Sequence, residues 1–244
     1  MTKDDPPVLE FENVTLEAAE RSESALLDVG FQLQAGELLL VLLDREHLHV
    51  SLGDAACGLL TPSSGVVRFT GEDWASLRAD EAADQRGRIR WLFDEESWVA
   101  NLDMDENLTL AERHHTPRAP DELREEATEL AQRFGLPGLP LGSPDRFPRQ
   151  DLRKAACVRA FMGRAALIFL ERPTKDIYAE VMSPLANAVY EARRRGAAVV
   201  WTTDNRGVWD DGGLKPTRRA FFSGARMHFC GSSHGEAISV PACQ

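Results

Sequence analysis

The chain has 244 residues, of which 43% are hydrophobic and 27% are charged, and its formal net charge is −11. This composition is typical of a soluble globular protein with one large core. The acidic balance argues against a general nucleic-acid-binding protein, because phosphate backbones select basic surfaces. The four cysteines contain no CxxC pair, which favours a reducing cytoplasm. The polar N-terminus has no signal-peptide core, and no apolar run reaches the ~20 residues of a membrane-spanning helix.

The first third of the chain predicts mostly β-structure. Residues 8–16 and 25–33 alternate apolar and polar side chains, as half-buried strands do. A turn at residues 35–37 leads into a continuous aliphatic strand at 38–43, and a helix is expected at about 50–58. The turn signal TPSSG precedes a further strand at 66–69. We expect antiparallel strands here, wrapped around one central buried strand.

The middle of the chain predicts a helical, acidic segment. A polar helical link at 77–87 leads to a strand at 88–93, after which residues 104–135 are acidic and helical in composition. Apolar residues recur at helical spacing over 123–134, and Gly135 is a typical helix stop. A Pro- and Gly-rich connector at 137–148 precedes a second helical stretch at 152–162.

The last part alternates strands and helices. Buried strands are predicted at 165–170 and 197–201, a helix at 181–195, and a hairpin from 220–222 to 227–229. Short aliphatic strands separated by helices indicate a parallel sheet with helical crossovers. The acidic helical segment is then an insert between two strands of that sheet.

The stretch at 35–60 is the frame in which P-loop proteins hold phosphate, a buried strand followed by a loop and a helix. The loop itself, LDREHLH at 43–49, contains neither glycine nor lysine. The frame is therefore present without the usual phosphate-binding side chains.

Several phrases resemble the nucleotide-binding domain of ABC transporters, namely AGE, CGLLTPSSGVVRFTGED, ENLTL and RAFMGRAALIFLERPT. The resemblance extends over nearly the whole chain. It implies an α/β fold with a P-loop NTPase-like (ABC ATPase) core, a mostly parallel sheet, an N-terminal antiparallel β subdomain and an inserted helical subdomain. It implies a single ABC-type domain over 1–244, with the core and β subdomain at about 8–94 and 162–230. The helical subdomain then covers about 95–161, and residues 231–244 form a C-terminal tail.

The Walker A segment departs from the family at every named position. Leu43, Glu46 and Leu48 stand at its glycines, and His49 and Val50 stand at its Lys and Ser/Thr. Leucine is strained at the positive φ angles that glycine permits. Glu46 repels a polyanion by roughly 4 kcal/mol at ~4 Å and an effective dielectric of ~20. His49 is mostly neutral at pH 7, and Val50 has no hydroxyl for Mg²⁺.

The other motifs depart in parallel. Asp94 stands at the Q-loop glutamine, Tyr178 at the D-loop aspartate and Thr203 at the switch histidine. Glu171 stands at the Walker B aspartate and Arg172 at the catalytic glutamate. The signature LSGGQ is replaced by Phe147, Pro148, Arg149, Gln150 and Asp151. These changes remove the general base, the phosphate lysine, the metal ligand and the switch together. We therefore predict a pseudo-ATPase that is not an enzyme and that binds neither ATP nor Mg²⁺.

The remaining candidate residues are not assigned to catalysis or to metal binding. His47 and His49 are expected in an exposed polar loop. The zinc-competent residues of the C-terminal part match no standard finger spacing, so we assign no metal to His228, Cys230, His234 and Cys243. In the family, the region after the Q-loop docks a permease, which makes Trp98, Val99 and Met104 possible permease contacts. The alternative is that Trp98 packs in the core of the insert.

Three functional hypotheses remain open at this point. The first is an inactive structural or regulatory subunit at the cytoplasmic face of a membrane ABC transporter, attached to the membrane through its partners. Those partners are a permease subunit and a second ABC ATPase subunit or a copy of this chain, and no nucleic acid. The acidic insert and Arg153-Lys154 resemble the lipid-trafficking branch associated with MCE proteins. The second hypothesis is a soluble interaction module that reuses the fold. The third is an ABC ATPase with a rebuilt nucleotide site, in which Ser51 and Glu171 hold Mg²⁺.

Overall fold

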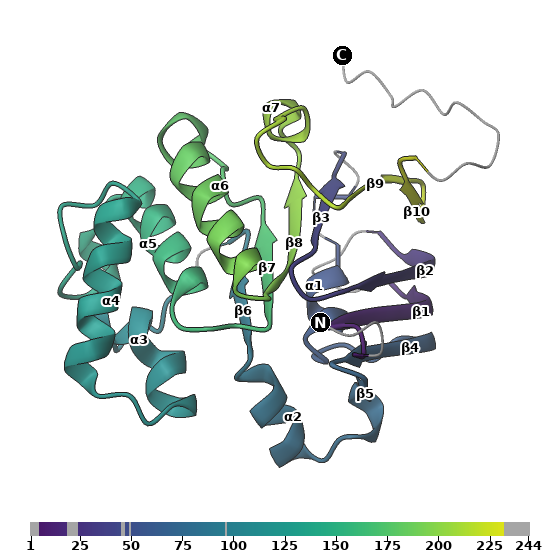
Figure 1. The fold of residues 1–244 in the computed structure, drawn as a ribbon, viewed down its shortest axis with the longest axis horizontal. Coiled ribbons are helices and arrows are strands. Elements are labelled where there is room, and N and C mark those ends of the chain that lie inside the picture. Colours follow the sequence, from purple (N-terminus) through teal and green to yellow (C-terminus); the bar gives the residue numbers. More distant parts are fainter. Residues whose placement is uncertain (1–4, 19–23, 45–46, 49, 96, 232–244) are drawn as a thin grey trace.

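The chain folds around two β-sheets (Figure 1). The computed structural model describes residues 5–18, 24–44, 47–48, 50–95 and 97–231. Within these residues a four-stranded antiparallel sheet has the order β2-β1-β4-β5, formed by Leu26–Leu33, Leu9–Leu16, Ser64–Phe69 and Glu72–Asp73. A six-stranded sheet has the order β10-β9-β3-β8-β7-β6, formed by Arg226–Phe229, Arg218–Ser223, Leu38–Leu42, Ala198–Thr203, Leu167–Glu171 and Ile89–Leu92.

The central strand β3 belongs to the larger sheet. It pairs in parallel with β8 and β9, and β8 and β7 extend the parallel order to β6. Every residue of β3 and β8 is buried, as expected for a parallel strand that is covered on both faces. The prediction that the N-terminal antiparallel strands wrap around this strand is therefore wrong. Strands β1 and β2 alternate buried and exposed residues and form a sheet of their own.

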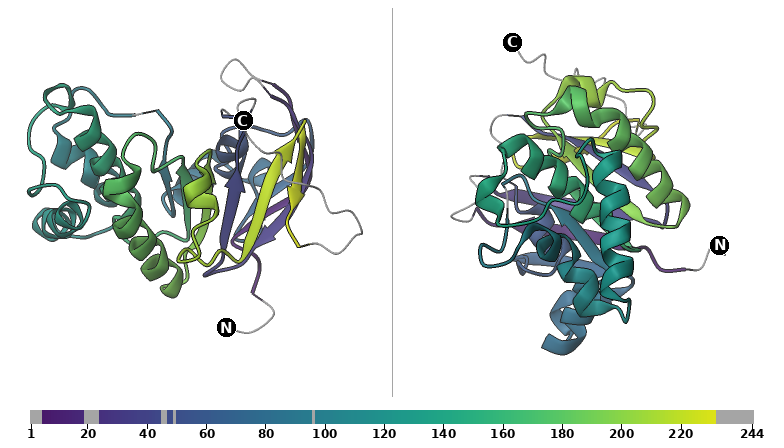
Figure 2. Two further views of the ribbon diagram at one scale, coloured as in Figure 1. Left: turned by 90° about the horizontal axis from the view of Figure 1, so that it is seen from above. Right: turned by 90° about the vertical axis from the view of Figure 1, so that its left-hand side faces the viewer.

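The helices lie mainly on one side of the parallel sheet (Figure 1; Figure 2). After β6 the chain forms the insert, and it then returns to β7. The insert contains α3 (Met104–His115), α4 (Pro120–Arg133) and α5 (Arg149–Phe161). The remaining helices are α1 (Leu52–Ala56), α2 (Ala79–Arg86), α6 (Tyr178–Arg194) and α7 (Arg206–Trp209), with short 3-10 turns at Trp74–Ser76 and Pro144–Arg146. The exact subdomain limits, 95–161 for the insert, stay a prediction.

The parallel sheet separates two hydrophobic cores. Leu38, Leu40 and Leu42 pack with the helices of the insert and with α6. Leu39 and Val41, on the opposite face of β3, pack against the antiparallel sheet and α1. The strand therefore holds both halves of the fold together, which accounts for its uninterrupted aliphatic sequence. Among the described residues, no helix has the length and apolarity to cross a membrane.

Candidate functional site

The carboxyl ends of the parallel strands bring several of the predicted motif positions together. Leu42 at the end of β3 lies opposite Thr203 at the end of β8, and Glu171 at the end of β7 lies opposite Thr202. The loop after β6 carries Asp94 to the same edge, where it contacts Glu171 and Arg172. Open α/β sheets bind their ligands at this edge. We therefore take it as the candidate site.

Arg172 is the centre of a buried ion cluster. Its Nε donates to Asp94 Oδ1 at 2.9 Å, and its Nη2 donates to Asp94 Oδ2 at 2.5 Å. Its Nη1 donates to Asp204 Oδ2 at 2.9 Å. Arg172 is 6% exposed and Asp94 is 9% exposed. A two-pronged guanidinium–carboxylate contact is the strongest ion-pair geometry available to proteins.

Two further cations complete this cluster. Lys175 Nζ lies 3.3 Å from Asp94 Oδ2. Arg153 of α5 donates to the carbonyl oxygens of Phe93, Asp94 and Arg172 at 2.8–2.9 Å. Burial raises the pKa of Asp94, but the hydrogen bonds and positive charge of Arg172 and Lys175 outweigh it and hold that pKa below its usual value. Asp94 is thus a carboxylate at neutral pH, and it ties the insert to the core.

Glu171 lies beside this cluster, against the first residues of α1. Its Oε2 accepts a hydrogen bond from the Asp94 backbone N–H at 3.1 Å. A Cβ atom on Gly53 would come within 3.0 Å of Glu171 Oε1. Burial raises the pKa of Glu171 to about 7. Ser51, the N-cap residue of α1, is 6% exposed and makes no side-chain capping hydrogen bond. Hydroxyl and carboxylate groups are oxygen ligands of the kind that Mg²⁺ prefers.

The loop after β3 follows an ordinary backbone path in its described part. Residues 43–44, 47–48 and 50–51 have no positive φ angle, in agreement with the strain that leucine would meet in a glycine-type loop. Leu43 donates its N–H to the carbonyl oxygen of Thr203 at 2.7 Å, so β3 continues one residue further against β8. Leu48 and Val50 are partly buried. Glu46 and His49 lie outside the described residues.

The expectation that His47 lies in an exposed loop is wrong. Its side chain is 2% exposed, its ring stacks on Phe222 with centroids 5.1 Å apart, and Nδ1 lies 2.6 Å from Asp44 Oδ1. An imidazole ring that stacks on an aromatic ring and has a hydrogen-bond partner can be buried at small cost. The loop is thereby anchored to β9.

The remaining motif positions are dispersed. Thr203 is fully buried, and its Oγ1 accepts the Asn205 N–H at 3.1 Å. Tyr178 begins α6, where its hydroxyl lies close to Gly207. In the signature segment Pro148 is the N-cap residue of α5 and is exposed, as are Arg149 and Gln150. Phe147 packs against the core, and Asp151 is partly buried.

The residues expected to contact a permease divide into two groups. Met104 is completely buried in the core of the insert, so the structure excludes it as a surface contact. Val99 is 40% exposed. Trp98 is partly buried against the core, with the Arg159 guanidinium 4.4 Å from its ring centre. The alternative for Trp98, packing on the core, therefore holds, and the permease contact of Trp98 and Val99 stays a prediction.

Metal binding gains no support within the described part of the chain, where no group of three or more His, Cys, Asp or Glu side chains could hold an ion. His228 stacks on Phe221 and Cys230 is exposed. His234 and Cys243 lie outside the described residues.

Sequence reasoning missed the ion cluster itself. Arg153, Lys175 and Asp204 had no assigned role, although each of them joins the cluster in the structure. One signal was present: opposite charges, Asp94, Arg172 and Asp204, end or directly follow three neighbouring strands of a parallel sheet. The carboxyl ends of such strands meet, so complementary charges at those positions predict ion pairs.

Several known proteins are similar to this chain in sequence. No protein-family model matches the chain. The macrolide export ATP-binding/permease protein MacB of Nitrobacter winogradskyi is 28% identical over 173 residues, which is 69% of this chain but only 26% of that protein. The lipoprotein-releasing system ATP-binding protein LolD of Idiomarina loihiensis is 22% identical, covering 74% of this chain and 79% of that protein. The cytochrome c biogenesis ATP-binding export protein CcmA of Gluconobacter oxydans is 28% identical, covering 81% and 83% respectively.

Solved structures of ABC transporter ATP-binding proteins have the same fold as this chain. The ATP-binding subunit of an ABC transporter superposes with a TM-score of 0.74 at 19% identity, covering 91% of this chain and 90% of that one. A dimeric bacterial ABC transporter cassette gives 0.77 at 18% identity, covering 89% and 95%. A dimeric cassette in a post-hydrolysis state, bound to ADP and Pi, gives 0.77 at 18% identity, covering 91% and 98%.

These relatives correct two predictions, that the chain is not an enzyme and that it binds neither ATP nor Mg²⁺. The curated relatives are named ATP-binding proteins, and one structural neighbour holds the products of hydrolysis. The lost side chains are not the whole of a phosphate site. Backbone N–H groups, which every residue except proline supplies, also contact phosphate, and Ser51 and Glu171 still carry side-chain oxygens. The prediction of the fold is confirmed: the chain has the ABC ATPase fold, and its homologues and structural neighbours are ATP-binding subunits of ABC transporters.

Proposed function

We propose that this chain is an ATP-binding subunit of a membrane ABC transporter, with a nucleotide site rebuilt around Ser51 and Glu171. The observation that carries the proposal is the position of Glu171. It lies at the carboxyl end of β7, its Oε1 is 3.0 Å from the place of a Gly53 Cβ, and its environment is largely dry. In this proposal Glu171 and Ser51, which is two residues before Gly53 in the sequence, each offer Mg²⁺ one oxygen ligand.

The ion cluster supplies charge next to this proposed metal position. Arg172 and Lys175 both contact Asp94, whose backbone N–H binds Glu171. Guanidinium and ammonium groups stabilise phosphate oxygens. In this proposal Lys175, which is partly exposed, offsets part of the phosphate charge that the family's P-loop lysine balances. Arg172 stays paired with Asp94 and Asp204 and positions the loop that carries Asp94. Neither cation can act as a general base while protonated.

Titration with ATP and Mg²⁺ by calorimetry tests the site. The natural chain should bind with a Kd below about 1 mM, and the double variant Ser51→Ala/Glu171→Gln should lose binding by at least about tenfold, because both proposed metal ligands are removed. The matched control is Ser223→Ala/Glu72→Gln, which changes the same residue types at exposed positions and should bind as the natural chain does. Unchanged affinity in the Ser51/Glu171 variant, or no binding by the natural chain, contradicts the proposal.

The same proposal assigns partners. A permease subunit would contact the surface at Trp98 and Val99, and a second ATP-binding subunit or a copy of this chain would form the dimer that a structural neighbour forms. The chain would then lie on the inner face of the membrane through these partners. Recovery of a membrane permease with the affinity-tagged chain, reduced by Val99→Asp, supports this assembly, whereas recovery of soluble partners only contradicts it. The lipid-trafficking assignment stays a prediction.

A further inference from the structure

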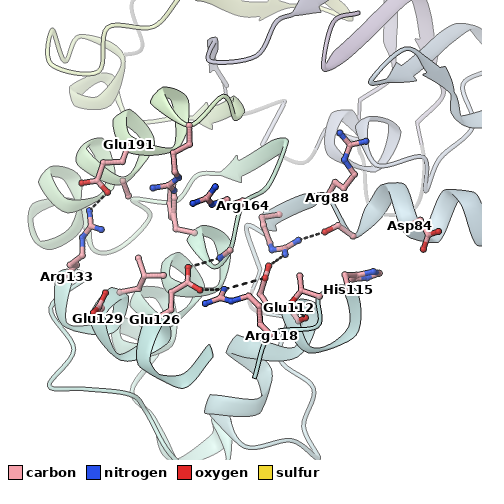
Figure 3. Close-up of a pocket in the computed structure, with 18 residues that line it drawn as sticks. Asp84, Arg88, Glu112, His115, Arg118, Glu126, Glu129, Arg133, Arg164 and Glu191 are labelled. Carbon is pink, nitrogen blue, oxygen red and sulfur yellow. Dashed lines mark hydrogen bonds and ion pairs between the residues drawn. The ribbon is translucent and has the colours of Figure 1, made fainter. Parts of the chain in front are cut away.

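A cavity lies at the edge of the parallel sheet that is opposite the candidate nucleotide site (Figure 3). Its volume is about 850 Å³, within the range of small-molecule sites. Arg88 and Arg164 of its lining precede strands β6 and β7, and Arg195 follows α6, so the cavity faces the amino ends of the strands. The candidate nucleotide site lies at the carboxyl ends. The two sites are therefore separate.

The wall of the cavity that belongs to the insert is electrically balanced. Glu112 of α3 pairs with Arg90 of β6. Arg118 Nη1 lies 2.5 Å from Glu126 Oε2 and 3.7 Å from Glu112 Oε2. Glu126 also accepts the Gly163 backbone N–H at 3.0 Å. These acids and bases neutralise one another, and Figure 3 shows their contacts as one chain across the cavity floor.

The facing wall carries positive charge that is not balanced. Arg164 and Arg195 are exposed and, within the described part of the chain, their side chains form no hydrogen bond or ion pair. Arg88 of the same lining is engaged by neutral groups: it donates to Gln85 at 3.0 Å and to Thr70 at 3.4 Å, and it lies 5.5 Å from the centre of the Phe69 ring. Arg164 and Arg195 also line an adjoining cavity of about 260 Å³. Two exposed arginines on one cavity wall, without an acidic partner among the described residues, are unexpected in a protein whose net charge is −11.

Two acids of the lining lie apart from this group. Asp84 and Glu129 form no ion pair within the described residues. Figure 3 shows them on opposite sides of the view, with Arg164 between them. They flank the cavity and leave its arginine wall unneutralised.

Arg90 belongs to the balanced wall of the cavity. It is 6% exposed, and its Nη groups donate to the carbonyl oxygens of Gly87 and Ile89 and to Glu112. The exposed positive charge of the lining that no other described side chain engages is therefore that of Arg164 and Arg195.

We propose that this cavity binds a small phosphorylated anion, held by Arg164 and Arg195. Guanidinium forks match the geometry of phosphate oxygens, and both of these side chains are exposed on the lining of one cavity. The volume exceeds what inorganic phosphate needs and suits a diphosphate or a phosphate ester. Because the lining comes from α3 and α4 on one side and from β6 and α6 on the other, the bound anion would bridge the insert and the core.

Calorimetric titration with inorganic pyrophosphate, at low ionic strength and without Mg²⁺, tests the proposal. We expect saturable binding with a Kd below about 1 mM that weakens at least about tenfold in Arg164→Gln/Arg195→Gln. The control Arg149→Gln/Arg194→Gln removes two exposed arginines elsewhere and should keep the affinity of the natural chain. Circular dichroism checks that each variant is folded.

A second experiment distinguishes binding in this cavity from binding at the proposed nucleotide site. Pyrophosphate binding should persist in Ser51→Ala/Glu171→Gln, so failure of the proposed function leaves this result untouched. Equal loss of binding in the two arginine variants, unchanged affinity in Arg164→Gln/Arg195→Gln, or no binding by the natural chain overturns the proposal.

Discussion

Arg172 and Asp94 neutralise each other across the carboxyl edge of the sheet, with Nε–Oδ1 at 2.9 Å and Nη2–Oδ2 at 2.5 Å. In the family that the chain resembles, these positions carry a catalytic glutamate and a glutamine. The two substitutions are complementary, because either residue alone would leave a charge in a nearly dry environment. They are therefore best understood as one change in the chemistry of the site.

This relationship predicts strong energetic coupling. Arg172→Met should lower the free energy of unfolding by about 3 kcal/mol, because it leaves Asp94 charged and only partly compensated. Asp94→Asn should cost a similar amount. The double variant should cost about 2 kcal/mol less than the sum of the two, since neither charge is then left alone. Urea denaturation of the four proteins measures the cycle, and additive losses would contradict a direct interaction.

The buried carboxyl of Glu171 predicts a pH-dependent stability. Burial raises its pKa from 4.5 to about 7 in the folded protein. The folded state therefore holds a proton that the unfolded state releases, and this contribution to stability is lost as the pH rises from about 4.5 through about 7. Relative to Glu171→Gln, which does not titrate, the natural chain should lose up to about 3 kcal/mol over this interval. Urea unfolding of both proteins at several pH values checks it, and parallel curves would rule out a buried, protonated Glu171.

Nucleotide binding should depend on the same proton in the opposite sense. A metal ligand must be ionised, so affinity for ATP with Mg²⁺ should fall by about tenfold between pH 8 and pH 6, as Glu171 becomes protonated. Ser51→Ala should bind more weakly and keep this pH dependence. Any residual binding by Glu171→Gln should not depend on pH in this interval. Calorimetry at the two pH values distinguishes these outcomes, and an identical slope in Glu171→Gln would show that another group titrates.

Gly53 is a packing requirement of the same region. A Cβ atom there would lie 2.4 Å from the Trp91 ring and 3.0 Å from Glu171 Oε1. Trp91 is stacked on Phe93 with ring centroids 4.4 Å apart, so it cannot move freely. Gly53→Ala should cost about 1–3 kcal/mol of stability through overpacking.

Two further variants separate overpacking from a backbone effect. The added change Trp91→Leu should recover part of the loss by making room. Gly138→Ala, at a position with no atom within 4 Å of the added Cβ, should change stability by no more than about 0.5 kcal/mol. Thermal unfolding measures all of these, and an equal loss in Gly138→Ala would contradict the steric explanation.

Much of the fold could be predicted from local pattern. Alternating residues at 9–16 and 26–33 and the aliphatic runs of β3, β7 and β8 give strands where the structure has them. The antiparallel strands were expected to wrap around β3, whereas they form a separate sheet that packs on one of its faces. An apolar strand buried on both faces belongs among parallel strands with helical crossovers, even when antiparallel strands precede it.

The site was less predictable, because its contacts join residues far apart in the chain. Asp94 and Arg172 are 78 positions apart, and each alone is indistinguishable from a solvated loop charge. His47 likewise lies in a charged segment whose composition indicates exposure, and only the packing of Phe222 shows that it is buried. The resemblance to the family assigns these residues to motif positions. It does not indicate which of them bind one another.

The three carbonyl contacts of Arg153 have a consequence for motion. One guanidinium on α5 holds the backbone oxygens of Phe93, Asp94 and Arg172, on two different strand-to-loop junctions. Any swing of α5 relative to β6 and β7 must strip a cation that is 4% exposed of these acceptors at once, at about 1.5–3 kcal/mol for each bond to a charged donor. Rotation of the insert therefore requires Arg153 to exchange these acceptors for others, in addition to breaking the Arg90–Glu112 ion pair.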